Sequence, residues 1–152
     1  MSRLVEELKS EHVALKKALK QASDFRIPAI ERVAMLDQIK TVLLAHLDKE
    51  NRELYPTLKV AAERDPSLRR TMKTFAEDME AITKQVMEFF DTYQDAGRVT
   101  EQLQTNVHSL IQFGGHLERL VSLLGFRIGR EERILYPEYD RIAFEMNMIS
   151  PF

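Results

Sequence analysis

Apolar residues recur at steps of three and four along most of the chain, and this spacing is the feature that most limits its fold. The clearest run has the apolar positions Leu68, Met72, Phe75, Met79, Ile82, Val86, Phe89 and Tyr93. This is the period of an amphipathic α-helix, and no segment shows the two-residue alternation typical of a strand. We therefore predict an all-α protein.

Turn signals divide the chain into four predicted helices. They lie at Pro28, Asp65–Pro66 and Asp95–Gly97. The fourth helix is expected to open at Thr100 and to continue to Leu135. Four amphipathic helices with short connections favour an antiparallel up-down four-helix bundle, whereas the Pro and Gly interruptions disfavour a long coiled coil. Residues 1–144 are predicted to form one bundle, followed by a C-terminal tail over 145–152.

Composition narrows the function classes. The chain has 152 residues and no cysteine, which excludes disulfides and thiolate metal ligands. Its 22 basic and 24 acidic residues are nearly balanced, so charge gives no reason to expect a nucleic acid or a membrane as partner. No apolar run approaches the ~20 residues of a membrane span, and the N-terminus does not resemble a signal peptide. A cytoplasmic protein is therefore expected.

Polar residues occupy positions on the apolar faces where a core would take leucine. His12 lies in the first stripe, and His46 and Glu50 are four residues apart on the second. Arg127 and Glu131 have the same spacing on the fourth. Because buried carboxylates need a positive partner, either a divalent metal or the Arg127 guanidinium must lie between the two acids.

An internal repeat relates these helices. Residues 46–56 align without gaps to residues 127–137, and five of the eleven positions are identical, including the Leu-Tyr-Pro that ends each copy. Glu50 aligns with Glu131, and His46 aligns with Arg127. Tyr55 and Tyr136 also align, and a packing role near a helix end is favoured for both. The bundle is therefore interpreted as two copies of a helical hairpin.

The pattern of Glu11-His12, then His46-x3-Glu50, then Leu54-Tyr55-Pro56 resembles the hemerythrin-like (HHE cation-binding) family over nearly the whole chain. The resemblance implies a di-iron centre with bridging carboxylates, in which one iron takes histidines from the first two helices. The second half departs from the family: the third-helix histidine falls near Met79 and the fourth-helix histidine falls on Arg127. Glu131, or Glu132 one step on, keeps the carboxylate position.

We interpret this departure as a mononuclear, or weakened dinuclear, non-haem metal site. His12, His46 and Glu50 would form a two-histidine, one-carboxylate set, with Glu131 as a fourth ligand and Arg127 as the counter-charge. Such sets suit iron, and manganese or zinc also fits. Met79, Glu132 and His116 are the further residues that could modify the site. The resemblance implies a role in binding O2 or NO, or in sensing iron or redox state.

Two other interpretations stay open. Arg127-x3-Glu131-Glu132 is weakly similar to the fourth-helix pattern of the sigma-70 regulator family, which suggests a metal-free bundle that binds a protein partner. Storage of a metal as cargo is the third interpretation, and a homodimer is compatible with each. The sequence contains no nucleophile constellation and no phosphate-binding glycine loop, so a binding protein is favoured over an enzyme.

Overall fold

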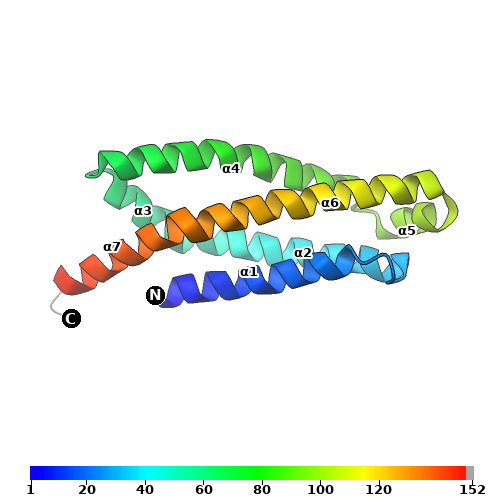
Figure 1. Ribbon diagram of the computed structural model, residues 1–152, viewed down its shortest axis with the longest axis horizontal. Helices are drawn as coiled ribbons and strands as arrows, with labels where there is room; N and C mark the ends of the chain where they lie inside the picture. Colours follow the sequence, from blue (N-terminus) through cyan, green and yellow to red (C-terminus); the bar gives the residue numbers. More distant parts are fainter. Residues whose placement is uncertain (150–152) are drawn as a thin grey trace.

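The computed structural model describes residues 1–149 and shows a bundle of four helical rods (Figure 1). The elements are α1 (Arg3–Ala22), α2 (Ala29–Lys49), η1 (Glu50–Leu54), α3 (Tyr55–Ala62), α4 (Pro66–Thr92), α5 (Ala96–Thr105), α6 (Val107–Arg130), η2 (Glu131–Leu135) and α7 (Tyr136–Ile149). Two rods are composite, α2-η1-α3 and α6-η2-α7. The described residues contain no strand, so the predicted all-α bundle is confirmed.

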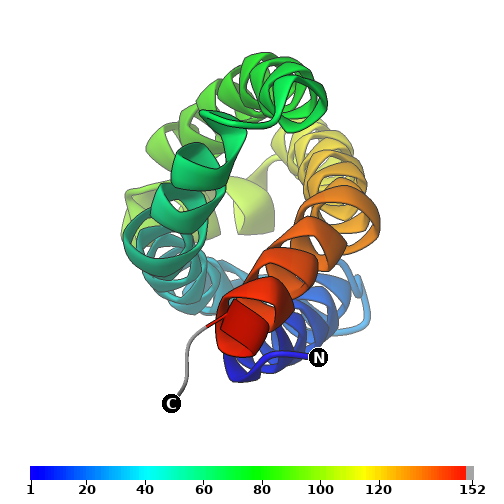
Figure 2. The ribbon, with the colours of Figure 1, turned by 90° about the vertical axis from the view of Figure 1, so that its left-hand side faces the viewer.

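The rods are arranged around a common axis, as the view along the bundle shows (Figure 2). Their buried apolar side chains form one hydrophobic core. α1 packs against α2 and α4 packs against α6, while contacts of α3 with α4 and of α1 with α6 complete the ring. The core side chains come from all four rods and are mainly leucines, with valines, isoleucines and phenylalanines. In the part of the chain that the structure describes, no helix is both long and apolar enough to cross a membrane.

Helix starts follow the expected capping chemistry. Side chains of Ser2, Asp65 and Asp95 accept hydrogen bonds from backbone amides three residues later. Asn106 does the same for Ser109, with an extended backbone, and it ends α5 as well as starting α6. The single fourth helix predicted from Thr100 is therefore wrong: Asn106 separates a short connecting helix from the long rod.

The C-terminal rod extends beyond the predicted domain boundary at residue 144. α7 continues to Ile149, so part of the predicted tail is helical, and residues 150–152 lie outside the described part. Arg141 explains the extension. Its guanidinium pairs with Glu138 at 2.7 Å and with Glu145 at 3.1 Å, which are three- and four-residue spacings that support a helix.

Two π-helical turns, η1 and η2, occupy equivalent positions in the two composite rods. In each turn the amide of the final tyrosine donates to the carbonyl of the glutamate five residues earlier, Tyr55 to Glu50 and Tyr136 to Glu131. A proline follows each tyrosine. Because a proline has no amide hydrogen and its ring crowds the preceding turn, the wider π turn lets the rod continue past it. Both π turns begin at the glutamates that the sequence singles out.

Candidate metal centre

A cluster of buried polar side chains lies where α1, α2-η1 and α6-η2 meet. His12, His46, Glu50, Arg127 and Glu131 are each at most 8% exposed. These are the residues that the sequence predicts on the apolar faces, and the fold brings all five together. Burial of so many ionisable groups is costly unless each one is paired, which makes their mutual geometry informative.

The two imidazoles face each other through their Nε2 atoms, which are 3.1 Å apart. Glu131 Oε2 lies 3.3 Å from His12 Nε2 and 3.7 Å from His46 Nε2. One donor atom from each of these three residues falls within 4.8 Å of the others. Two imidazoles and one carboxylate from three rods therefore form a compact donor set that could hold a metal ion.

Glu50 completes the cluster as a second carboxylate. Its Oε1 is 3.6 Å from His46 Nε2, and its side chain is fully buried. Among the described residues, Oε1 has no hydrogen-bond partner. The most compact set thus contains Glu131, and Glu50 lies beside it with one oxygen that no described residue binds.

A second layer of residues orients the imidazoles. His46 Nδ1 lies 2.8 Å from Glu11 Oε1, and Lys49 pairs with the other oxygen of Glu11. With Nδ1–H donating to that carboxylate, the Nε2 lone pair of His46 is directed into the cluster, as in metal sites with a carboxylate behind the histidine. Glu132 Oε2 lies 3.5 Å from His12 Nδ1, on the side of His12 away from the cluster, and no described residue forms a hydrogen bond with this Nδ1. No pattern in the sequence indicated the role of Glu11 beyond its place beside His12.

Arg127 fills the half of the cluster opposite the histidines. Its Nε donates to Glu131 Oε1 at 2.7 Å, and its Nη1 donates to Thr83 Oγ1 at 2.8 Å. Its Nη2 is 3.8 Å from Glu50 Oε1. The predicted role of Arg127 as an inward counter-charge agrees with this placement. Met79 is buried on α4 and lines the same small cavity as Arg127.

Tyr136 lies at the centre of the cluster, where sequence reasoning had favoured only a packing role. Its hydroxyl oxygen is 2.7 Å from Glu131 Oε2, 3.0 Å from Glu50 Oε2 and 3.2 Å from His12 Nε2. A phenol has one proton to donate, so it cannot satisfy all three acceptors. The one available signal was its place in the Leu-Tyr-Pro that ends each copy of the internal repeat.

The pKa shifts in the cluster show that its buried carboxylates favour the binding of protons or of a cation. Burial lowers the pKa of His46, but the carboxylates of Glu131 and Glu50 outweigh it and raise this pKa to about 10. Burial and the neighbouring Glu131 carboxylate raise the pKa of Glu50 to about 8. Burial acts to raise the pKa of Glu131 too, yet hydrogen bonds and Arg127 hold it well below its usual range. The acceptors therefore need protons or a cation among them.

The donor chemistry fits a divalent metal ion. Two imidazole nitrogens and two carboxylates are the ligand types that Fe2+, Mn2+ and Zn2+ take, and Glu50 Oε1 is a buried acceptor with nothing to accept. His12, His46, Glu131 and Glu50 are the residues that would hold such an ion. Arg127 would neutralise the negative charge on the carboxylate oxygens that face away from the ion.

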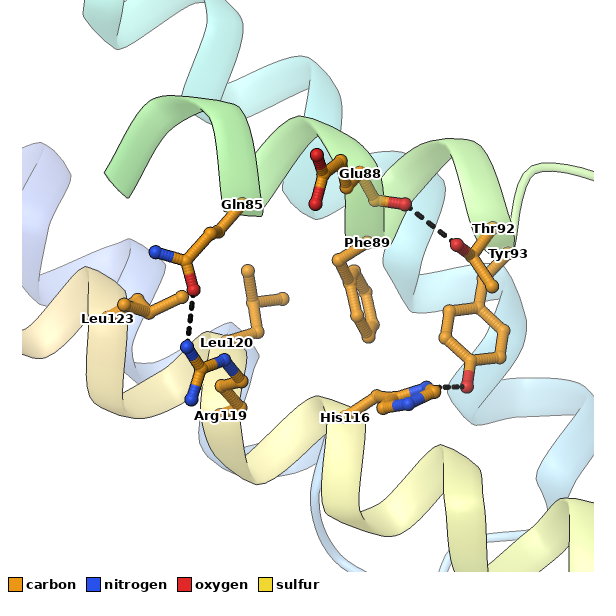
Figure 3. Close-up of a pocket in the computed structure, with 9 residues that line it drawn as sticks. All are labelled: Gln85, Glu88, Phe89, Thr92, Tyr93, His116, Arg119, Leu120 and Leu123. Atoms are coloured by element: carbon orange, nitrogen blue, oxygen red, sulfur yellow. Dashed lines mark hydrogen bonds between the residues drawn. The ribbon is translucent and has the colours of Figure 1, made fainter. Parts of the chain in front are cut away.

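The structure does not bring His116 to this cluster. His116 is exposed on α6, where its Nδ1 and the Tyr93 hydroxyl are hydrogen-bond partners across a groove between α4 and α6 (Figure 3). Arg119 and Gln85 make a second contact across the same groove. The sequence suggestion that His116 modifies the metal site is therefore not supported by its position.

Comparison with protein families gives one result that covers most of the chain. The sequence profile of the hemerythrin HHE cation-binding domain matches residues 3–139. Comparisons with curated proteins and with solved structures give no match. The matched range contains all the rods of the bundle except the last turns of α7, together with every residue of the buried cluster. The chain therefore belongs to the hemerythrin HHE cation-binding domain family.

Proposed function

We propose that this protein holds a single divalent metal ion, iron in the first place, at His12, His46, Glu131 and Glu50. The observation that carries the proposal is the convergence of the two Nε2 atoms at 3.1 Å, with a buried carboxylate oxygen within 3.7 Å of both. Two facing lone pairs repel each other unless a proton or a cation lies between them. A metal ion satisfies both imidazoles and both acids together.

A mononuclear site is favoured over a dinuclear one because of Arg127. Its guanidinium already donates to Glu131 Oε1 and lies near Glu50 Oε1, which are the carboxylate oxygens a second ion would need. A fixed positive charge there repels another cation. Met79 adds only a thioether on that side, a soft ligand that suits copper(I) better than Fe2+ or Zn2+.

The proposed role is binding of O2 or NO, or sensing of iron or redox state, in the cytoplasm. A ferrous ion with two imidazole and one or two carboxylate ligands keeps open positions for water or a diatomic molecule. Around it, Glu11 would orient His46, Arg127 would hold Glu131, and the Tyr136 hydroxyl would hold a proton within 3.2 Å of the His12 donor atom. These residues bind and orient, which fits a binding protein better than an enzyme.

A metal-free regulator that binds a protein partner is the second candidate. It is favoured by the Arg127–Glu131 pair and the Tyr136 hydrogen bonds, which supply part of the positive charge and donors that the acids need without any ion. On this account the buried cluster is structural, and metal is not taken up.

Metal analysis of protein purified without chelators or an affinity tag separates the two candidates. We expect one iron per chain after anaerobic loading with Fe2+, and a new visible absorption when NO is added. His46→Ala should abolish uptake, whereas the matched variant His116→Ala, on the exposed face of α6, should keep it. No uptake by the unmodified protein would refute the proposal, and so would full uptake by His46→Ala. Uptake well above one ion per chain would indicate storage.

A further inference from the structure

A cavity of about 240 Å³ lies beside the buried cluster, on the side away from the histidines. It runs between η1-α3 and α4, and Arg127 and Leu135 form part of its lining. The cavity is therefore of the size of a small organic molecule rather than of a large cofactor.

One part of the cavity wall is apolar and consists of Met72, Phe75, Ala76, Met79 and Leu135. The other lining residues are polar: Asn51, Tyr55, Lys59, Glu80, Thr83 and Arg127. Phe75, Met79 and Leu135 are buried, and Met72 is half-buried. Walls of this kind favour an apolar group over water, because they offer no hydrogen bonds to replace those of the solvent.

The polar groups of the cavity are mostly hydrogen-bond donors. Arg127 uses Nε on Glu131 and Nη1 on Thr83, and no described residue accepts a hydrogen bond from its Nη2. The two hydrogen bonds to Glu131 and Thr83 use two of its five N–H groups, and Glu50 Oε1 lies 3.8 Å from Nη2. Thr83 accepts from Arg127, so its own hydroxyl hydrogen is free to donate. Burial raises the pKa of Tyr55, whose hydroxyl thus stays protonated beside the same guanidinium.

A charged donor group next to apolar walls selects a particular ligand. A guanidinium recognises a carboxylate through paired N–H donors, and a cation in this position would repel an amine. Lys59 adds a second positive group among the residues that line the cavity, where Glu80 is the only acid. The chemistry that matches all of these features is an anionic head with a short hydrocarbon tail.

We propose that this cavity binds a short-chain monocarboxylate, with the carboxylate on Arg127 and Thr83 and the tail against Met72, Phe75 and Met79. The proposed carboxylate contacts are to Arg127 and Thr83 and not to the metal donors, so the inference goes beyond the proposed function. Arg127 is the residue that the two sites share, because its Nε also donates to Glu131. A variant at Thr83, which leaves the Arg127–Glu131 pair in place, therefore separates a failure of carboxylate binding from a failure of metal uptake.

The test uses butyrate as the probe and the methionine methyl groups as reporters. In protein labelled with ¹³C at the methionine methyls, butyrate should shift the Met72 and Met79 signals in a saturable way. Met35 and Met87, which do not line the cavity, should keep their positions. Butylamine and 1-butanol have the same tail without the anionic head, so they should not reproduce the shifts. The titration is made on chelator-treated protein and again with Zn2+ added.

Two variants locate the carboxylate. Arg127→Met should weaken butyrate binding by about ten-fold or more, the effect of losing a charged donor. Since this variant loses a buried charge and could unfold, Thr83→Val keeps the guanidinium and should weaken binding several-fold. Thr92→Val, an exposed threonine further along α4, is the matched control and should bind butyrate normally.

Three results would overturn the inference. The first is the lack of a saturable Met72 and Met79 shift with butyrate, and the second is an equal shift with 1-butanol, which would show a merely apolar cavity. The third is a shift that appears only with Zn2+ and is lost in His46→Ala, because the carboxylate would then be a ligand of the metal. Normal butyrate shifts in a protein that takes up no metal would support the inference and refute the proposed function alone.

Discussion

The two halves of the buried cluster have the same backbone conformation but carry different side chains. Each half has a helix, a π turn that begins at a glutamate, and then a tyrosine followed by a proline. In the first half the position four residues before the glutamate is His46, whose Nε2 faces the cluster and can bind a metal once the ring has lost its proton. In the second half it is Arg127, a permanent cation that donates to Glu131 at 2.7 Å. The same local geometry thus presents a lone pair on one side and a positive charge on the other.

The π turn therefore positions each carboxylate. The residue one turn earlier, a histidine or an arginine, determines whether the carboxylate is paired with a metal ion or with a guanidinium. Both glutamates are buried and both approach the Tyr136 hydroxyl. On the histidine side they face two imidazoles and need a cation or protons. On the arginine side they already have a counter-charge, and an apolar cavity replaces further ligands.

The largest expected change comes from making the second half like the first. The double variant Met79→His with Arg127→His removes the fixed charge, frees Glu131 Oε1 and Glu50 Oε1, and supplies the histidines that the family resemblance implies. We expect the metal content to rise from one to two ions per chain. Anaerobic titration with Fe2+ followed by elemental analysis measures this directly. A metal content that stays at one ion per chain would mean that further residues, besides Met79 and Arg127, prevent a second metal from binding.

Removal of the Arg127 guanidinium alone should show how much it contributes to the free energy of unfolding. Arg127→Met leaves Glu131 buried without its cation, and breaking such a pair costs about 3–5 kcal/mol. Urea unfolding of metal-free protein should show this loss, and Zn2+ should restore much of it because a metal ion can replace the missing charge. Arg130→Met, at a partly exposed arginine 3.6 Å from Asp78, should cost less than about 1 kcal/mol. Equal losses in the two variants, or no recovery with Zn2+, would contradict the paired roles of Arg127 and the metal.

The carboxylate behind His46 is a feature of the first half alone. Glu11→Gln keeps the size of the side chain but weakens the acceptor at His46 Nδ1. Losing such an outer partner typically lowers metal affinity about 10–100-fold. Competition with a chromophoric chelator for Zn2+ would measure the change. Glu7→Gln, one turn earlier on α1 and 3.6 Å from Lys49, is the matched control, and its affinity should stay close to that of the unmodified protein. A similar loss in both variants would point to general charge rather than to orientation of His46.

Much of this arrangement could be predicted from the sequence because helical periodicity places side chains on faces. A histidine or a glutamate at an apolar position, as at His12 and Glu50, must be buried if the helix packs at all. The internal repeat then indicated that Arg127 replaces a histidine and faces the same point. These inferences needed only spacing, the cost of buried charge and alignment of the two copies.

Other features depend on contacts between rods, which spacing does not describe. A π turn adds a residue to the helical register, so periodicity alone could not place the residues that follow Glu131. Tyr136 follows that turn, and its hydroxyl reaches the cluster for the same reason. Asn106 lies among residues that suit a helix, and only its extended backbone shows that it separates α5 from α6.

The smallest expected effect compares the two tyrosines that follow the π turns. Tyr136→Phe removes the hydroxyl between the two carboxylates and leaves buried acceptors without their donor. Tyr55→Phe removes a hydroxyl beside Arg127, where the cavity can admit water. The free energy of unfolding of metal-free protein should fall by about 1 kcal/mol more for Tyr136→Phe than for Tyr55→Phe, the net value of a buried hydrogen bond. Urea denaturation of both variants at one pH gives the difference, provided that the slopes of the two transitions agree. A larger loss for Tyr55→Phe would reverse the comparison, because it would make the arginine side, and not the histidine side, the more dependent on its tyrosine.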